Sequence, residues 1–280
     1  MYSLNQRTIV FSGATSGIGR VAAVVAASQG ARVVALCRNI DKGQNLLRSY
    51  ITNHPDAKGT IELLECDLAS LQSISNACNA IIVKYPSIDI IVNNAGTWNF
   101  EFIETTDGIE NTLQVNMLAP ILIINRLKDL LLKSENPKVI NTASALHQGN
   151  INFDDLEFRK AFSGFKAYRQ SKLGIILLTR YYQHIFGNEG ITFLSQHPGL
   201  VDTELVRKGN RISKLFFVIF GKSPEEGART LINLLITPPQ YLRGGEYYKN
   251  LNVSKTYTRT SYNLDIAQRL DMVCKKYLNL

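Results

Sequence analysis

Tyr168 and Lys172 stand four residues apart in a stretch, 167–186, that has the period of a helix. At this spacing both side chains project from one face of the helix. A phenol beside an ammonium group can give a proton to a carbonyl oxygen that is becoming an alkoxide, or take the proton back in the reverse reaction. Ser144 follows a predicted strand and could donate a hydrogen bond to the same oxygen. These residue types predict interconversion of a carbonyl and an alcohol.

The ordinary pKa of tyrosine makes Tyr168 a poor base at neutral pH, so alcohol oxidation requires a stabilised phenolate. An ammonium at Lys172 and the positive charge of an oxidised cofactor would lower the pKa of Tyr168 by about 2 to 3, or roughly 3 to 4 kcal/mol of differential interaction. A single Tyr-x-x-x-Lys is usually an exposed helix pair, and a serine after a strand is usually a turn residue. Their combination with a nucleotide-binding loop indicates a catalytic site.

The first predicted strand ends in a glycine-rich loop that opens a helix. The run is Ser12-Gly13-Ala14-Thr15-Ser16-Gly17-Ile18-Gly19-Arg20, with the pattern G-x-x-x-G-x-G. Glycines let the backbone turn tightly and approach a pyrophosphate, whose charge the helix N-terminus then holds. No Gly-Lys-Ser/Thr follows, which excludes a P-loop. The residues predicted to bind the cofactor here are Gly13, Thr15, Ser16, Gly17, Ile18 and Gly19.

The second predicted strand, 32–36, ends at Cys37-Arg38, where a dinucleotide-binding fold meets the adenosine ribose. A carboxylate at this place would accept a hydrogen bond from the 2′-hydroxyl of NAD, whereas an arginine suits a 2′-phosphate. Arg38 therefore predicts NADP(H) as the cofactor. The alternative is an ordinary solvated arginine.

Short apolar runs alternate with longer helical stretches up to about residue 200, which predicts βαβ units and a parallel sheet. Strands are expected at 8–11, 32–36, 61–65, 88–92, 138–142, 192–196 and 245–248. Helices are expected at 17–28, 41–53, 71–84, 109–133, 167–186 and 224–236. The fold class is α/β: one doubly wound Rossmann-type domain over 1–280, with strand order 3-2-1-4-5-6-7 and helices on both faces.

Composition limits the classes of protein that fit. The 280 residues carry a net charge of +8, with 45% hydrophobic and 19% charged residues, which excludes a disordered or fibrous chain. The basic residues are spread along the chain without a recognised nucleic-acid motif, so nucleic acid is not an expected partner. Solubility and attraction of a triply phosphorylated cofactor explain the charge.

Cysteine usage and apolar runs indicate the compartment. The four cysteines show no metal-ligand spacing, so no metal site is expected and a reducing compartment fits them. The chain enters its first strand without a signal segment, and the run 215–220 is far shorter than the roughly 20 residues that span a bilayer. We expect a cytoplasmic protein, peripheral to a membrane at most.

Three motifs in this order resemble the short-chain dehydrogenase/reductase family over nearly the whole chain. They are the glycine loop, Asn93-Asn94-Ala95-Gly96 and Tyr168-Arg169-Gln170-Ser171-Lys172. The stretch Ser144-Ala145-Leu146-His147-Gln148-Gly149-Asn150-Ile151-Asn152-Phe153-Asp154-Asp155-Leu156 resembles more narrowly the branch of retinol dehydrogenases and related NADPH-linked carbonyl reductases. This narrower match says more about fold than about substrate.

The resemblance implies roles for further residues. Asp67 and Leu68 would contact adenine, and Asn94, Ala95 and Gly96 would line the ribose of the cofactor. The Pro-Gly segment would lie beside the nicotinamide, through Pro198, Gly199, Val201 and Thr203. Lys172 would also hold the ribose hydroxyls, and Tyr168 would also contact the cofactor. The predicted catalytic set is Asn116, Ser144, Tyr168 and Lys172, with Asn116 supporting a water chain to the lysine.

Segment 203–223 corresponds to the substrate lid of the family. Its apolar and aromatic run implies a lipophilic aldehyde, ketone or alcohol, although a core helix would have the same composition. Its mixture of basic and aromatic residues also suits peripheral contact with an anionic membrane. The resemblance further implies a homodimer or homotetramer that packs through 109–133 and 167–186. The alternative function is a catalytically silent NADP(H)-binding sensor.

Overall fold

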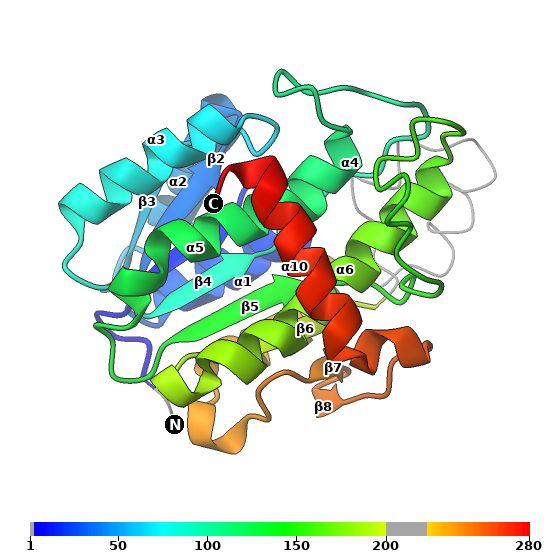
Figure 1. Ribbon diagram of the computed structural model, residues 1–280. Coiled ribbons are helices and arrows are strands. Elements are labelled where there is room, and N and C mark those ends of the chain that lie inside the picture. Colours follow the sequence, from blue (N-terminus) through cyan, green and yellow to red (C-terminus); the bar gives the residue numbers. More distant parts are fainter. Residues whose placement is uncertain (1–2, 200–222) are drawn as a thin grey trace.

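The computed structural model describes residues 3–199 and 223–280, and in these ranges eight strands form one sheet with helices on both faces (Figure 1). The strand order is β3-β2-β1-β4-β5-β6-β7-β8. The strands are β1 (Thr8–Ser12), β2 (Arg32–Cys37), β3 (Thr60–Glu65), β4 (Ile90–Asn93), β5 (Lys138–Thr142), β6 (Thr192–His197), β7 (Tyr247–Lys249) and β8 (Asn252–Val253). The predicted fold class and the order 3-2-1-4-5-6-7 are confirmed. The edge strand β8, antiparallel to β7, was not predicted.

Alternating residues of each central strand enter two different cores, as the period of a strand requires. Ile9, Phe11 and Val33 face one core, whereas Val10 and Val34 face the other. Because both faces are covered, the strands read as continuous apolar runs.

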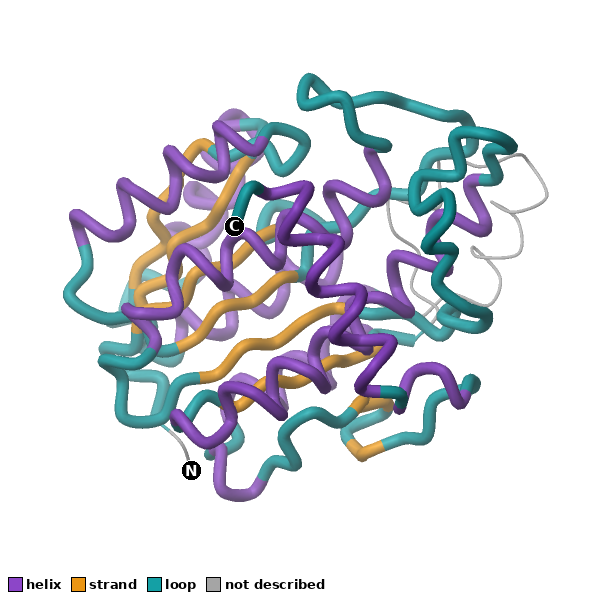
Figure 2. The backbone as a smooth tube through the Cα atoms, viewed as in Figure 1, coloured by secondary structure: helices purple, strands orange, loops and turns teal. Residues whose placement is uncertain are grey.

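Each face of the sheet has its own layer of helices (Figure 2). Helices α1 (Gly17–Ser28), α2 (Ile40–Asn53) and α9 (Pro224–Ile236) contribute to one core. Helices α3 (Leu71–Lys84), α5 (Ala119–Leu131), α6 (Gly164–Phe186) and α10 (Leu264–Leu278) contribute to the other. Side chains of Asn39, Ser70, Ser163 and Ser223 cap the N-termini of α2, α3, α6 and α9, each accepting a hydrogen bond from a backbone N–H of the first turn.

The single helix predicted over 109–133 is interrupted. It consists of a short α4 (Asn111–Leu113), a π-helical turn η1 (Gln114–Leu118) and α5. A π turn inserts one residue into the ladder and is invisible to hydrophobic periodicity. It matters here because Asn116, a predicted site residue, lies within it.

Helix α10 was also not predicted, and it packs on α6 (red in Figure 1). The buried Tyr182 hydroxyl of α6 donates to Asp271 Oδ1 of α10 at 2.7 Å. Gly174 marks the crossing of three elements, because a Cβ there would lie 2.2 Å from Met117 Sδ of η1 and 3.4 Å from Leu270 Cδ2 of α10. Helix α10 thus packs on α6, one of the two helices through which the resemblance implies packing against a partner subunit.

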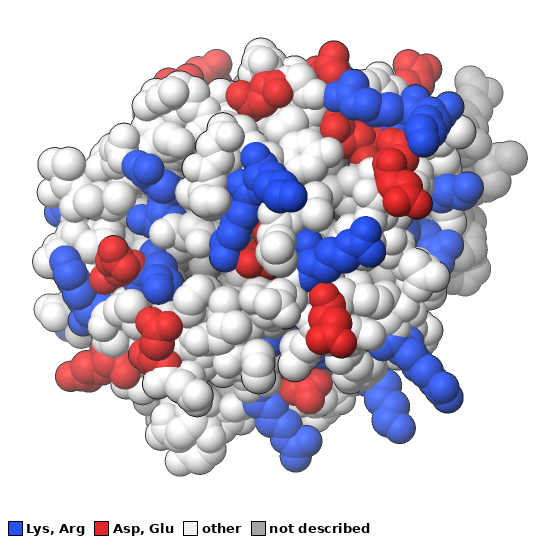
Figure 3. Space-filling model, viewed as in Figure 1, with Lys and Arg blue, Asp and Glu red and all other residues white. Residues whose placement is uncertain are grey.

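Three further properties of the described residues concern their surface charge, their cysteines and the length of their apolar helices. Lys and Arg are interspersed with Asp and Glu over the face seen in Figure 3. All four cysteines are free and buried, and burial raises the pKa of the Cys37 thiol to about 11. Among residues 3–199 and 223–280, no helix is long and apolar enough to cross a membrane, and no cluster of His, Cys, Asp and Glu could hold a metal ion.

Candidate active site

The carboxyl ends of four neighbouring strands are joined by side-chain hydrogen bonds. Gln196 Nε2 on β6 donates to Thr142 Oγ1 on β5 at 2.9 Å, and Thr142 Oγ1 donates to Asn94 Oδ1 after β4 at 3.3 Å. The backbone N–H groups of Asn94 and Ala95 then donate to Ser12 Oγ at the end of β1, at 3.1 and 3.2 Å. These bonds fix the edge of the sheet from which the predicted site residues extend.

The glycine loop is folded tightly against the segment after β4. Gly13 has a φ of +71°, and a Cβ there would lie 2.8 Å from the Cα of Ala95. A Cβ at Gly19 would lie 2.0 Å from the carbonyl oxygen of Gly13. A side chain at either position would clash with neighbouring backbone atoms, so both glycines are needed for the loop to pack. The packed loop in turn is what could lie close to a phosphate.

The N-terminus of α1 has the properties of an anion site. Its N-cap Ser16 makes no side-chain capping bond, and the first turn carries no acidic residue. Ser16 is exposed, Thr15 and Gly17 are half-buried, and Ile18 is buried. The N–H groups and the positive end of the helix dipole are consequently available to a pyrophosphate. The residues present thus fit the dinucleotide that the glycine loop predicts.

Two predicted adenosine contacts lie beyond neighbouring strands. Arg38 is exposed directly after β2, and Asp67 is half-buried after the adjacent β3. The Asp67 carboxylate accepts from the backbone N–H of Ala69 at 3.0 Å, which orders the turn that also holds the buried Leu68. Arg38 and Asp67 therefore flank the edge as predicted, on the β2–β3 side of the glycine loop.

Helix α6 presents Tyr168 and Lys172 to the centre of this edge. Their exposed fractions are only 7% and 4%. Lys172 Nζ lies 5.7 Å from the centroid of the Tyr168 ring and donates to the carbonyl oxygen of Thr142 at 2.9 Å. A Cβ at Gly96 would lie 3.4 Å from the same Nζ. The lysine thus sits between the phenol and the predicted ribose segment.

Ser144 completes the predicted trio. Burial raises the pKa of the Tyr168 phenol, and the interaction with the Ser144 hydroxyl lowers it by a smaller amount. Burial also lowers the pKa of Lys172 to about 8. In the protein alone, burial disfavours the phenolate more than its neighbours stabilise it, so the lowering of the Tyr168 pKa expected beside an oxidised nicotinamide stays a prediction. Tyr168 is accordingly a protonated phenol at neutral pH.

Asn116 is held entirely by hydrogen bonds to its neighbours. Its Oδ1 accepts from Thr97 N at 2.7 Å, and its Nδ2 donates to Thr97 O at 2.9 Å and to Ser171 Oγ at 3.0 Å. The carboxamide therefore ties the segment after Gly96 to α6. Through Asn116, the π turn connects the segment after β4 to the helix that carries Tyr168 and Lys172.

The end of β6 is described only in part. Pro198 and Gly199 follow β6, and Gly199 has a φ of +90°, a conformation that favours glycine. Val201, Thr203 and the predicted lid 203–223, apart from Ser223, lie outside the described residues.

Sequence reasoning did not single out Trp98. The only tryptophan of the chain, it stacks on Tyr168 with ring centroids 4.7 Å apart and planes at 15°. It also contacts Phe100 and Phe165, whose side chains are half exposed. Its place two residues after the Asn94–Gly96 motif was the available signal. His147, which was left out of the predicted set, is fully buried behind Ser144.

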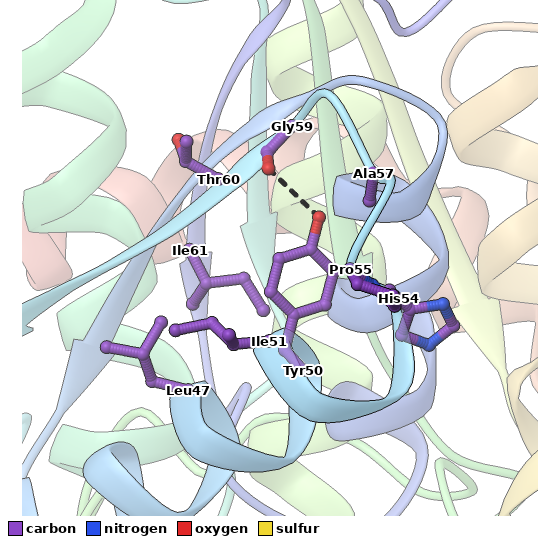
Figure 4. A pocket seen from close by; sticks show the side chains of 9 residues that line it. All are labelled: Leu47, Tyr50, Ile51, His54, Pro55, Ala57, Gly59, Thr60 and Ile61. Carbon is purple, nitrogen blue, oxygen red and sulfur yellow. Dashed lines mark hydrogen bonds between the residues drawn. The ribbon is translucent and has the colours of Figure 1, made fainter.

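A pocket of about 240 Å³ lies elsewhere, between the C-terminus of α2 and the start of β3 (Figure 4). Tyr50 forms one wall and donates its hydroxyl hydrogen to the Gly59 carbonyl at 2.9 Å. This pocket adjoins the amino end of β3, whereas the predicted site lies at the carboxyl ends of the strands. The two are therefore at opposite edges of the sheet.

Comparison with known proteins gives consistent matches. The family model described as short chain dehydrogenase matches residues 7–212. Retinol dehydrogenase 14 of Homo sapiens is 33% identical over 263 residues, covering 88% of this chain and 78% of that protein. Retinol dehydrogenase 11 of Homo sapiens is 30% identical over 272 residues, covering 96% and 85%. Polyprenol dehydrogenase of Homo sapiens is 32% identical over 276 residues, covering 94% and 82%.

Solved structures share the fold. A crystal structure of an uncharacterized protein from Mycobacterium Paratuberculosis superposes with a TM-score of 0.79 at 26% identity, covering 100% of this chain and 96% of that one. The RhlG/NADP active-site complex of Pseudomonas aeruginosa has a TM-score of 0.70 at 24% identity, covering 88% and 94%.

Proposed function

The chain belongs to the short chain dehydrogenase family, whose members are oxidoreductases that use nicotinamide cofactors, and from this premise we propose an NADP(H)-dependent carbonyl reductase or alcohol dehydrogenase. The observation that carries the proposal is the meeting of Ser144, Tyr168 and Lys172 at the edge that also holds the glycine loop. A protein that only sensed nucleotide would have no chemical need for these three groups together.

In this reaction the bound nicotinamide supplies the hydride for reduction, or accepts it in oxidation. Ser144 and Tyr168, whose side chains interact, donate to the same carbonyl oxygen of the substrate. Tyr168 gives its proton to this oxygen as negative charge develops there. Reduction requires a protonated phenol, which tyrosine is at neutral pH, and burial shifts the pKa of Tyr168 further in that direction. Lys172 stabilises the phenolate that remains and holds the ribose hydroxyls.

Arg38 supports NADP(H) over NAD(H). It is exposed at the end of β2, where its guanidinium can reach a 2′-phosphate. The other predicted contacts, from the glycine loop to Pro198 and Gly199, would hold the remainder of the cofactor.

A lipophilic substrate is supported by the surroundings of Tyr168. Trp98 covers its ring, and Phe100 and Phe165, exposed by 53% and 45%, extend this apolar wall. Relatives of the chain are named for retinol and polyprenol, both lipophilic alcohols.

The test is NADPH consumption by the purified protein with a panel of aliphatic, aromatic and isoprenoid aldehydes and ketones, and NADH in parallel. Turnover that Tyr168→Phe abolishes would support the enzyme and rank its substrates. Tight NADPH binding with no turnover on any member would contradict the proposal and favour the sensor.

Two further proposals concern association. Peripheral membrane contact through 204–222 predicts co-flotation with anionic liposomes at low salt, and failure to float would contradict it. A homodimer or homotetramer built on α6 must accommodate α10, so light scattering of the intact chain and of a variant at the exposed α10 residue Met272, Met272→Glu, tests whether that surface is used.

A further inference from the structure

His147 lies at the start of the long connection after β5 and is fully buried. Its Nδ1 is 2.6 Å from the carbonyl oxygen of Ser144, and its Nε2 is 3.0 Å from the backbone nitrogen of Tyr257. A carbonyl oxygen can only accept, and an amide N–H can only donate. The imidazole is therefore neutral, with its proton on Nδ1 and its lone pair on Nε2.

The surroundings favour this neutral form. Burial lowers the pKa of His147, and the nearby cations Arg180, Arg169 and Lys249 lower it further, against the opposing effect of the Ser144 carbonyl. The rings of Tyr247 and Tyr257 pack on the imidazole at centroid distances of 5.2 and 5.3 Å. In an imidazolium, Nε2 would also carry a proton, and its N–H would face the backbone N–H of Tyr257, which is itself a donor.

Ser144 is held from two sides. Its carbonyl oxygen accepts from His147 and also from the Tyr247 hydroxyl at 3.2 Å. Its hydroxyl accepts from the backbone N–H of Leu146 at 3.1 Å and interacts with the Tyr168 side chain, whose pKa it lowers. A rotation of the Ser144–Ala145 peptide would shift the turn that places the Leu146 N–H, and so remove a hydrogen bond that fixes the Ser144 hydroxyl.

The second ring nitrogen connects this serine to a distant part of the chain. Tyr257 lies 110 residues after His147, in the segment 254–262 that follows β8. The same segment contacts the loop twice more, because Thr258 Oγ1 donates to Gly149 O at 3.4 Å and Thr260 Oγ1 donates to Asn150 Oδ1 at 2.7 Å.

We propose that His147 is a positioning residue: it orients the Ser144 hydroxyl toward Tyr168 and makes that orientation depend on the docking of segment 254–262. In its kinetic consequences the inference rests on the proposed function. Its structural part, the orientation of Ser144, can be measured without any substrate.

The kinetic test separates the two ring nitrogens. In His147→Asn the amide nitrogen takes about the place of Nδ1 and can still donate to Ser144, whereas in His147→Gln the amide takes about the place of Nε2. Loss of a positioning hydrogen bond corresponds to about a tenfold loss of kcat, which we expect for His147→Ala and His147→Gln. His147→Asn should recover most of the rate.

A double-mutant cycle asks whether the effect passes through Ser144. If it does, His147→Ala lowers the already small kcat of Ser144→Ala by less than twofold, because the group being positioned is absent. Independent effects would multiply, and that result would overturn the proposal, as would equal rates for His147→Asn and His147→Ala.

Two controls and one spectroscopic readout complete the design. Tyr182→Phe loses the buried bond to Asp271, so it controls for general destabilisation and should keep kcat.

In the spectra of ¹⁵N-labelled protein, the proposal predicts a neutral imidazole with its proton on Nδ1 and slow amide exchange at Leu146 and Tyr257. Exchange should accelerate at Leu146 in His147→Ala and be slowed again in His147→Asn. If the wild type turned over no substrate, the proposed function would fail, while unaltered exchange at Leu146 in His147→Ala would separately overturn the positioning role.

Discussion

Two buried lysines occupy opposite ends of β5, and they differ in how many hydrogen bonds they make. Lys138 begins the strand, has no exposed surface, and donates to the carbonyl oxygens of Leu234, Leu235 and Thr237 at 2.8, 2.7 and 3.0 Å. Lys172 comes from α6 to the other end, where it donates to the carbonyl of Thr142. Burial lowers both pKa values, that of Lys138 to about 7 and that of Lys172 to about 8.

The difference shows what distinguishes a structural lysine from a functional one. Three carbonyls use all three protons of the Lys138 ammonium and complete the C-terminus of α9. The described residues occupy one proton of Lys172, so two remain for ribose hydroxyls or the phenolate. Burial and a lowered pKa are common to both lysines. Unused donors at the carboxyl edge are the informative property.

The largest expected effect separates chemistry from stability at the two ends of the sheet. Tyr168→Phe should lower kcat by about 10³-fold, because it removes the acid, while NADPH affinity stays within a few fold. Tyr50→Phe, at the opposite edge, loses only its bond to Gly59 and should keep kcat. Steady-state kinetics and fluorescence titration with NADPH measure both. A Tyr168→Phe enzyme with more than a tenth of the activity would exclude the phenol as the acid.

The lysine pair tests the comparison directly. Lys138→Met leaves three buried carbonyls without their donor and should lower the free energy of unfolding by about 2 to 4 kcal/mol, with kcat of the folded protein retained. Lys172→Met should do the reverse, lowering kcat by about 10² while removing a desolvated charge at little cost in stability. Urea denaturation measures the free energy of unfolding of both variants, and steady-state kinetics measures their kcat. Similar losses of kcat would mean that unused donors do not mark function.

Arg38 should control the choice of cofactor. Arg38→Glu places a carboxylate against the 2′-phosphate and should reduce the ratio of kcat/KM for NADPH to that for NADH by about 10 to 100-fold. Arg48→Glu makes the same charge change on the exposed surface of α2 and serves as the matched control. If both variants changed the ratio equally, net charge rather than a 2′-phosphate contact would explain the preference.

The smallest effect is a dependence on pH. A lysine is charged below its pKa, so Lys172 loses its charge as pH rises through about 8. Two donors to the ribose weaken with it, and NADPH affinity should fall by about three- to tenfold between pH 7 and 9. Titrations across this range should show the change in wild type and in Lys138→Met, but not in Lys172→Met. The same change in Lys172→Met would assign the titration to another group.

Much of the scaffold could be predicted from local patterns. Apolar runs, helical stretches and turn residues located β1 to β7 within about two residues, and the βαβ alternation with glycine loop indicated the strand order. Helix α10 was missed although Ala267, Leu270, Cys274 and Leu278 recur at helical spacing after the N-cap residue Asn263. The π turn at Asn116 was missed because one inserted residue leaves the apolar pattern of 109–133 intact.

The types and order of residues along the chain were sufficient to predict the α/β fold, the dinucleotide loop and the Ser144, Tyr168 and Lys172 set, because these depend on local periodicity and on the rule that parallel strands end at one edge. Tertiary structure alone decided the electrostatics and the support of that set. The pKa of Tyr168 rises because packed neighbours exclude water from the phenol. His147 meets Tyr257 across 110 residues, a contact that only the complete fold creates. Desolvation and long-range hydrogen bonds depend on which distant residues become neighbours, and no local pattern encodes them.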